Sequence, residues 1–399
     1  MSPTRVMIFS SSFLPKAGGL QYELKWYLDS LDEWCASRQD YEFSFVSPGQ
    51  TSLKFAKFKN IQSFDLDFDE FSPRGTATSL RTLFRLSRVL RKIQPDVVHC
   101  HAVLPDAGLI WLASLGMRTR PKIVTTSHGQ DIVVFPEYDY GSRRSSRMNR
   151  VIKFFANRLS AHVLPSAALG RFADDLGVDS SKRVVIPNGL PIGSEPDFEY
   201  KEDSKSSASD HTNEDLSGIR FMSLSSGRPI KNLDILVEAF AEVRGSLGDS
   251  RLLLACVGPS AVHIHELVDR LNVRDHVDFI GEVSGTEKRE YFRSADVYCQ
   301  TSQFENSPVS LLESMKFGSA IIASNVGGVP EMIQDGHNGI LVDQNDVQDV
   351  AAALLLMYQD SDLRKLLISN GVDYVKNHSM FRTIEKYSEV YKSVTAGGN

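Results

Sequence analysis

The chain has 399 residues, of which 42% are hydrophobic and 24% are charged. This composition is that of a globular protein, and it excludes fibrous and largely disordered classes; the length suffices for two domains of roughly 150 to 200 residues each. A formal net charge of -6 at pH 7 argues against a general nucleic-acid-binding protein, which carries a strongly basic domain.

Cysteine usage and the N-terminal sequence indicate the cellular environment. The 4 cysteines are widely scattered and form no C-x-x-C pair, which predicts neither a zinc site nor a disulfide framework. Few apolar residues precede the N-terminal serine run, and no later apolar run reaches the length of a membrane span. We therefore expect a cytoplasmic protein that is soluble or attached peripherally to the inner face of a membrane.

The first predicted strand leads through a glycine loop into a helix. Residues 6–9 form a buried apolar run, which is followed by SSSFLPKAGGL and then by apolar residues at helical spacing. Gly18 and Gly19 would let a ligand approach the backbone where this helix begins, as in phosphate-binding loops. A simple turn explains the same glycine pair, and neither G-x-G-x-x-G nor a Walker lysine accompanies it.

Three aspartates alternate with apolar residues after the second predicted strand, at residues 43–46. Asp65, Asp67 and Asp69 lie in the segment FDLDFDEF. Alternating carboxylates suit a divalent metal beside a diphosphate, whereas the period of two also predicts an ordinary strand with its aspartates facing water. We favour the strand and predict no metal site.

Two basic clusters in the first half of the chain lack acidic residues. The first lies on a predicted amphipathic helix at residues 79–93. Its members are Arg81, Arg85, Arg88, Arg91 and Lys92, and those of the second are Arg143, Arg144, Arg147, Arg150, Lys153 and Arg158. Such a helix more often packs on a sheet with its charges in water, but basic amphipathic helices also bind anionic membranes. Two clusters favour peripheral membrane contact or an anionic acceptor.

Histidines follow two further predicted strands, in DVVHCH and IVTTSHGQD. Strands that alternate with helices form a parallel sheet with its ligand crevice at the strand ends. A metal triad of His99, His101 and His128 is not favoured, because no further ligand pattern accompanies it. His128 is the better functional candidate, since Gly129 leaves space beside the imidazole and Asp131 would orient it.

A serine- and acid-rich stretch separates the two halves, at residues 193–218. It holds too few aliphatic residues to fold, so we expect a flexible linker or insertion. The alternation of strands and helices then restarts. Strands are predicted at residues 221–224, 252–257, 277–280, 297–299 and 320–323, with a helix at residues 233–243. Arg228 and Lys231, in the strand-to-helix loop SSGRPIKN, would neutralise a diphosphate.

The stretch QFENSPVSLLESMKFG contains two glutamates, Glu305 in a loop and Glu313 in the predicted helix that follows. Ser307 and Pro308 predict the helix start, because a serine oxygen caps free amide groups and proline suits the first helical position. Gly318 predicts its end. A helix start attracts anions through its unpaired N–H groups and its dipole. The stretch therefore suits a ligand that combines hydroxyl groups with phosphate, such as a nucleotide sugar.

In their order and spacing, these motifs resemble the retaining, nucleotide-sugar-dependent glycosyltransferases of family 4. The resemblance runs from the Gly18 and Gly19 loop through DVVHCH, SHGQD, VIPNGL, SGRPIKN and ENSPVSLLE to ASNVGGVPEMIQDGHNGILV. It implies the α/β GT-B fold, with two facing Rossmann-like domains and the active site in the interdomain cleft. The implied parts are an acceptor-side domain at residues 1–190, a linker at 191–218, a nucleotide-sugar-binding domain at 219–380 and a helix at 381–399 that crosses back to the first domain.

The resemblance also implies a role for each matching residue. Glu305 would face the hydroxyls of the donor sugar, and Glu313 would hold the ribose. Arg228 and Lys231 would bind the diphosphate, and His128 would contact the transferred sugar near the reacting carbon. The catalytic candidates are thus His128, Glu305, Arg228 and Lys231, and the donor-binding candidates are Gly18, Gly19, Arg228, Lys231, Ser307, Pro308, Val309 and Glu313.

The predicted function is sugar transfer from a nucleotide-diphosphate donor to a hydroxyl acceptor that is a glycan, a lipid-linked sugar or a small molecule. The family implies retention of anomeric configuration, and we expect no metal or other cofactor. Two alternatives stay open, a nucleotide-sugar epimerase on the same fold and a catalytically silent sugar-nucleotide-binding protein. Asn306, Ser307 and Pro308 stand where many relatives have a phenylalanine–glycine pair. This difference leaves the donor sugar open. The nucleotide base, the acceptor and the oligomeric state do not follow from the sequence.

Overall fold

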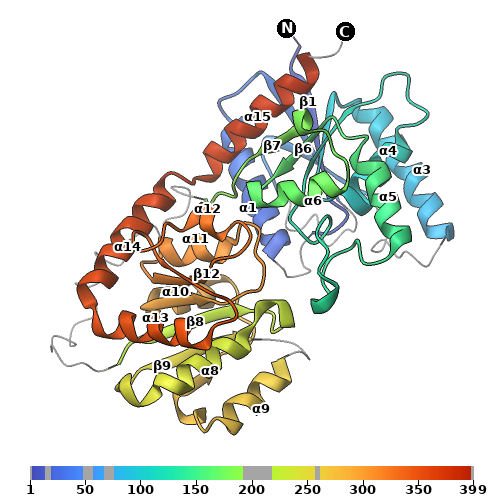
Figure 1. The fold of residues 1–399 in the computed structure, drawn as a ribbon. Coiled ribbons are helices and arrows are strands. Elements are labelled where there is room, and N and C mark those ends of the chain that lie inside the picture. Colours follow the sequence, from blue (N-terminus) through green and yellow to red (C-terminus); the bar gives the residue numbers. More distant parts are fainter. Residues whose placement is uncertain are drawn as a thin grey trace. The chain divides into compact units, whose positions relative to one another are not determined.

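The structure, a computed structural model, describes residues 2–13, 19–47, 57–66, 76–191, 218–256 and 261–396. The chain divides into two compact units, Met1–Ser194 with Ser379–Asn399, and Glu195–His378. Gly18, Asp67, Asp69 and nearly all of the serine- and acid-rich stretch lie outside the described residues. Each unit contains a parallel sheet with helices packed against it, as the sequence predicts (Figure 1).

The first unit is built on a seven-stranded sheet with the strand order β3-β2-β1-β4-β5-β6-β7. Its strands are β1 (Thr4–Phe9), β2 (Tyr41–Ser47), β3 (Ile61–Asp65), β4 (Val97–Cys100), β5 (Lys122–Thr126), β6 (Ala161–Leu164) and β7 (Arg183–Val185). Every residue of β4 and β6 is buried, which is typical of parallel strands that are covered on both faces. The order reverses between β1 and β4, and a ligand crevice lies outside such a reversal in this class of sheet.

The last helix of the chain completes the core of the first unit. The longer helices of this unit are α1 (Gly19–Cys35), α3 (Thr76–Ile93), α4 (Gly108–Ala113), α5 (Ser146–Ala156), α6 (Gly170–Asp175) and α15 (Met380–Ala396). Helix α15 packs against α1 and β5. Its side chains Met380, Ile384, Tyr387, Val390 and Tyr391 lie in the same buried cluster as residues of β1 and β2. Their spacing of three or four residues places them on one helix face.

The second unit has a six-stranded parallel sheet with the order β10-β9-β8-β11-β12-β13. The strands are β8 (Arg220–Ser225), β9 (Arg251–Cys256), β10 (Val277–Phe279), β11 (Val297–Gln300), β12 (Ala320–Ser324) and β13 (Ile340–Val342). The helices are α8 (Leu233–Val243), α9 (Val262–Arg270), α10 (Gly285–Ser294), α11 (Val309–Lys316), α12 (Val329–Met332), α13 (Val347–Gln359) and α14 (Ser361–Lys376). Here the order reverses between β8 and β11.

Most predicted elements are confirmed, and the exception is the strand of alternating aspartates. The predicted helix at residues 233–243 coincides with α8, and strand predictions in both units lie within two residues of the observed bounds for β1, β9 and β12. Strand β3 instead ends at Asp65, and Leu66 after it is buried. Among the described residues, no helix combines the length and the apolar character that a membrane span requires.

The position of α15 in the core predicts the effect of truncating one of its side chains. Ile384 is 2% exposed, so Ile384→Ala removes buried methyl groups and leaves a cavity. We expect it to lower the free energy of unfolding of the first unit by about 2 to 5 kcal/mol. Urea unfolding followed by tryptophan fluorescence measures this, because all 3 tryptophans lie in the first unit.

The exposed neighbour Lys386 provides the matched control. Lys386→Ala should change the free energy of unfolding by less than about 0.5 kcal/mol. Equal unfolding midpoints for the two variants would show that α15 does not contribute to this core.

Candidate functional site

Lys231 and Glu305 meet where the strand order of the second sheet reverses. Lys231 ends a short helical turn after β8, and Glu305 lies in the loop after the neighbouring strand β11. The Nζ atom of Lys231 is 2.6 Å from Oε1 of Glu305. Because the carboxyl ends of parallel strands lie at the same edge of a sheet, the topology brings these distant residues together.

The carboxylate of Glu305 is held by three donors on one oxygen. Besides Lys231, Gln300 Nε2 donates to Oε1 at 2.8 Å and Ser302 Oγ donates to it at 2.7 Å. The Glu305 side chain is only 11% exposed, so these bonds fix its orientation. Within the described residues, Oε2 receives no hydrogen bond. That oxygen is therefore the one that can accept hydroxyl groups of a ligand.

A glycine of the second unit lies directly against the Glu305 backbone. The carbonyl oxygen of Glu305 accepts a hydrogen bond from the Gly328 N–H at 3.0 Å. The adjacent Gly327 has a φ of +54°, and a Cβ atom there would lie 1.9 Å from the same carbonyl oxygen. Only glycine fits so close an approach in this conformation. The segment NVGGVPE therefore holds the loop that carries Glu305.

Glu313, in the second turn of α11, pairs with Lys288 of α10. The Nζ atom of Lys288 is 2.8 Å from both carboxylate oxygens. Burial raises the pKa of Glu313 above its ordinary value, although Lys288 and Lys316 oppose this shift. Lys288 was not predicted from the sequence, because no motif surrounds it and only the packing of α10 on α11 reveals the pairing.

The start of α11 corrects one prediction. The helix begins at Val309, and Pro308 occupies the cap position with an extended ψ of 114°, so it is not the first helical residue. Pro308 has no side-chain acceptor that could cap the helix, and the Oγ atom of Ser307 lies 4.0 Å from the sulfur of Met332. The proline keeps its allowed φ but not a helical ψ, which moves the start by one residue. Gly318, with a φ of +78°, follows the helix as predicted.

Arg228 shares the loop of Lys231. Its side chain is exposed, and its Nε atom donates to the Oγ atom of Ser226 at 3.1 Å. It precedes the helical turn that ends at Lys231. An exposed guanidinium and a half-buried ammonium thus lie on one short loop, and both are donors that suit phosphate oxygens.

In the first unit, a second polar cluster lies at the ends of β4 and β5. His101 follows β4 and His128 follows β5, and these strands are direct neighbours. His101 Nδ1 is 3.2 Å from His128 Nε2, and the two rings are stacked. On the other side of its ring, His128 Nδ1 is 3.4 Å from Oε2 of Glu23, in the helix α1 that begins at Gly19.

The charge of this cluster is concentrated on one imidazole. Burial opposes a charge on His128, but the carboxylates of Glu23, Asp131 and Asp106 together outweigh it and raise the pKa of His128 above the ordinary histidine value. Burial and the two neighbouring histidines hold the pKa of His101 well below that value. His128 then donates from both ring nitrogens, to Glu23 and to a neutral His101.

The carboxylate beside His128 is Glu23 and not the predicted Asp131. Asp131 Oδ2 instead accepts hydrogen bonds from Ser127 Oγ at 2.8 Å and from the Val103 N–H at 3.1 Å, and Asp131 acts on His128 only through its charge. Glu23 could not be predicted from local sequence patterns, because its contact with His128 joins α1 to the loop after β5.

His99 is held by the last helix of the chain. Its Nδ1 lies 2.7 Å from the hydroxyl of Tyr391, and its Nε2 lies 2.8 Å from the hydroxyl of Thr126. Burial, with His128 nearby, lowers the pKa of His99 to about 3. Among the described residues, no group of three or more His, Cys, Asp or Glu side chains is placed to hold a metal ion.

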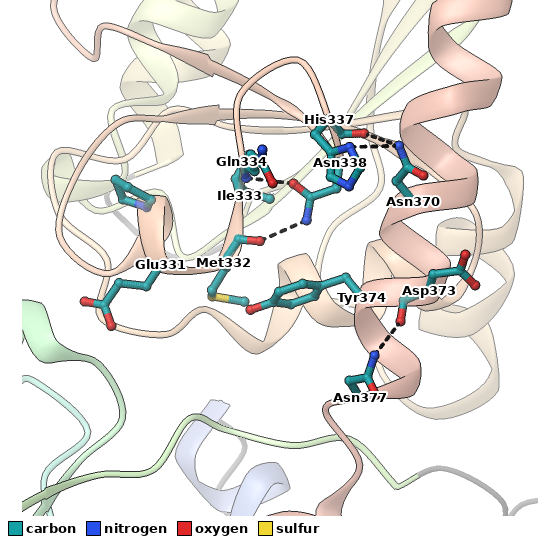
Figure 2. Close-up of a pocket in the computed structure, with 11 residues that line it drawn as sticks. Glu331, Met332, Ile333, Gln334, His337, Asn338, Asn370, Asp373, Tyr374 and Asn377 are labelled. Carbon is teal, nitrogen blue, oxygen red and sulfur yellow. Dashed lines mark hydrogen bonds between the residues drawn. The ribbon is translucent and has the colours of Figure 1, made fainter.

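A separate cavity of about 450 Å³ lies beside α12 and the last turns of α14 (Figure 2). Its lining is rich in amide and carboxylate side chains, such as Gln334, Asn370 and Asp373. Neither lysine–carboxylate pair contributes to it, and no lysine or arginine lines it. A diphosphate needs cationic donors, so the lysine pairs are the better candidate for a nucleotide.

Comparison with known proteins matches both halves of the chain to glycosyltransferase families. A family model described as Glycosyltransferase Family 4 matches residues 34–193. A second model, described as Glycosyl transferases group 1, matches residues 205–373. The chain is also 25% identical to N-acetyl-alpha-D-glucosaminyl L-malate synthase of Bacillus anthracis, over 90% of this chain and 91% of that protein.

Solved structures show the fold. Sucrose-phosphate synthase of Thermosynechococcus elongatus superposes with a TM-score of 0.77 at 18% identity, over 99% of this chain and 100% of that one. HepE of Anabaena, in complex with UDP-glucose, gives a TM-score of 0.72 at 18% identity, over 98% and 99% of the two chains. The two parallel-sheet units thus have the GT-B architecture that the sequence predicts.

The contact between Glu23 and His128 predicts a change in titration. Glu23→Gln removes the carboxylate but keeps the burial, so we expect the pKa of His128 to fall below its usual value of about 6.5. In the wild-type chain it should lie above that value. Its folded pKa is then above the unfolded one, so the stability that this pair contributes is complete below the unfolded pKa and is lost as pH rises through the folded pKa.

NMR titration of the histidine ring resonances measures the shift. Glu33→Gln, on the exposed side of the same helix, is the matched control and should leave the titration of His128 unchanged. An unchanged pKa in Glu23→Gln would contradict the assignment.

Proposed function

The chain belongs to the family-4 glycosyltransferases, and on this premise we propose that it transfers a sugar from a nucleoside-diphosphate donor to a hydroxyl acceptor. The observation that carries the proposal is the Lys231–Glu305 contact of 2.6 Å at the carboxyl ends of β8 and β11, in the unit that also holds the Lys288–Glu313 pair. One loop cluster thereby offers cations for a diphosphate and carboxylates for hydroxyl groups. The UDP-glucose complex of HepE supports UDP-sugars as the first donors to test.

In the proposed reaction, Lys231 and Arg228 stabilise the leaving diphosphate. Negative charge grows on the phosphate as its bond to the anomeric carbon breaks, and cations already positioned there need no rearrangement. The N–H groups at the start of α11 add to this field, because the cap residue offers them no side-chain acceptor. Protein side chains, not a metal ion, supply this stabilisation in the proposal.

The two glutamates have different parts in donor binding. Glu305 accepts hydroxyls of the sugar through Oε2, while its other oxygen stays bound to Lys231, Gln300 and Ser302. Glu313 accepts the ribose hydroxyls. A carboxylate has about four lone-pair sites, so Glu313 can bind hydroxyls without losing Lys288.

The first unit supplies the acceptor side in this proposal. His128, beside Glu23, contacts the transferred sugar near the reacting carbon. The acceptor hydroxyl attacks from the face that the diphosphate leaves, and a diphosphate oxygen takes its proton, which gives retention of configuration. No protein nucleophile is required. The acceptor is a sugar, a glycan or a lipid-linked hydroxyl.

Removing the Lys231 ammonium tests the assignment to the diphosphate. Each charge-assisted hydrogen bond is worth about 1.5 to 3 kcal/mol, so Lys231→Ala should lower kcat about 10- to 100-fold. Lys231→Arg keeps a cation and should lose less. The rate is measured as UDP release with a UDP-sugar and an acceptor, and the exposed Arg270 of α9 gives the control Arg270→Ala. Wild-type turnover in Lys231→Ala would refute the role of Lys231.

The two carboxylates should affect different ligands. Glu313→Gln is expected to weaken binding of UDP and of the UDP-sugar alike, about 10-fold or more, because both carry ribose. Glu305→Gln should weaken only the UDP-sugar. Thermal stabilisation measures both, since a ligand at 100 times its dissociation constant adds about 2.7 kcal/mol. If Glu305→Gln lowered the affinity for UDP as much as for the sugar nucleotide, Glu305 would not be reading the sugar.

A further inference from the structure

Large apolar side chains are exposed on three neighbouring helices of the first unit, α3, α4 and α5. We call this surface the basic apolar face. Its apolar members are Leu80, Phe84, Leu112, Leu115, Met148, Val151 and Phe154. Leu80 is 70% exposed and Phe84 is 63% exposed. Single exposed apolar residues are common, whereas a group of them on one surface marks an interaction site.

Contacts between the helices make the face continuous. Ser87 of α3 donates a hydrogen bond to the carbonyl oxygen of Ala113 at the end of α4, at 2.7 Å. Trp111 of α4 packs against Phe154 and Phe155 of α5, with ring centroids 5.6 Å and 5.8 Å apart. The three helices lie side by side in Figure 1. Their exposed side chains therefore form one surface.

The ionic side chains of these segments are all cationic. They are Arg81, Arg85, Arg88, Arg91, Lys92, Arg118, Arg120, Arg147, Arg150, Lys153 and Arg158. No aspartate or glutamate occurs in residues 76–93, 108–120 or 145–158, although the whole chain has a net charge of -6. The three segments that carry the face are thus positively charged, against the overall sign of the chain.

Cations and apolar groups alternate closely on the face. The guanidinium carbon of Arg158 is 3.4 Å from the ring centroid of Phe154, and that of Arg88 is 6.0 Å from the ring of Phe84. An arginine over an aromatic ring places its charge beside an apolar surface. The partner of this face must therefore accept both kinds of group within a few ångströms of each other.

We propose that the basic apolar face docks on a lipid bilayer with anionic headgroups. The apolar side chains enter the boundary between headgroups and acyl chains, and the guanidinium groups contact the lipid phosphates. A nucleic acid would neutralise the cations but leave the apolar side chains in water. A second copy of the chain would bring two sets of like charges together. An anionic bilayer satisfies both features of the face.

Flotation of the full chain with lipid vesicles tests the proposal. One set of vesicles contains phosphatidylcholine alone, and the other contains phosphatidylcholine mixed with phosphatidylglycerol. We expect the chain to float with the anionic vesicles, and to do so less as salt is raised, because salt screens the headgroup charge. Equal binding to both sets, or to neither, would overturn the proposal.

Two double variants separate the apolar and ionic contributions. Leu80→Ser with Phe84→Ser should lower partitioning at least about 10-fold, because two side chains lose their burial in the bilayer. Arg88→Gln with Arg150→Gln should lower it about fivefold per charge. The control is Val262→Ser with Leu366→Ser, which changes side chains that are 58% and 52% exposed in the second unit, and it should bind as the wild type does.

Further outcomes distinguish other occupants and protect the test from misfolding. Circular dichroism must show wild-type folding in each variant, and all these residues lie outside the proposed donor and acceptor groups, so transfer to a soluble acceptor should be unchanged. If the chain floats with the anionic vesicles but transfers no sugar, only the proposed function is contradicted. If the chain self-associated in sedimentation and Leu80→Ser with Phe84→Ser abolished this, the face would be an interface between copies, and the bilayer proposal would be wrong. It would also be wrong if RNA bound the face and vesicles did not.

Discussion

The candidate donor site depends on two carboxylates that are withdrawn from water and paired with lysines. Glu305 and Glu313 have side chains that are only 11% and 10% exposed, and a carboxylate at such a position needs a cation or hydrogen-bond donors in place of the water it has lost. Lys231 and Lys288 supply those cations from different elements. The reversal of strand order between β8 and β11 brings the first pair together, and the packing of α10 on α11 brings the second. The fold of the second unit and the chemistry of its site thus rest on the same contacts.

Three of the four histidines of the first unit, His99, His101 and His128, lie in one stack and differ in pKa. His99 is bonded to hydroxyl groups at both nitrogens, and burial lowers the pKa of His99 and of His101, whereas Glu23 and two aspartates overcome burial and raise the pKa of His128. The imidazole with the highest pKa is therefore that of His128, at one end of the stack. Burial alone would leave all three neutral. Among the carboxylates that raise the pKa of His128, Glu23 of α1 contributes most, and Asp131 and Asp106 add to it.

Most helices and strands could be predicted from local sequence patterns. The residues that were missed make contacts between distant parts of the chain. Helix α8 and the buried strands follow from hydrophobic period and from turn residues, which act over a few positions. Motif order identified the family and with it Lys231, Glu305 and Glu313. Lys288 and Glu23 were missed, since each acts through a residue on another element. The start of α11 was misplaced because a serine before a proline has two compatible helix starts, and only the ψ of Pro308 distinguishes them.

The place of α15 in the first unit has a consequence for synthesis. A chain emerges from the ribosome N-terminus first, and domains generally fold as they emerge. The core around β1 and β2 lacks Ile384, Tyr387 and Tyr391 until the last residues have been made. The second unit, although it is translated later, has all its strands and helices before that point. The first unit is therefore the first to be translated and the last to be completed. Its core lacks the side chains of α15 while the second unit is being translated.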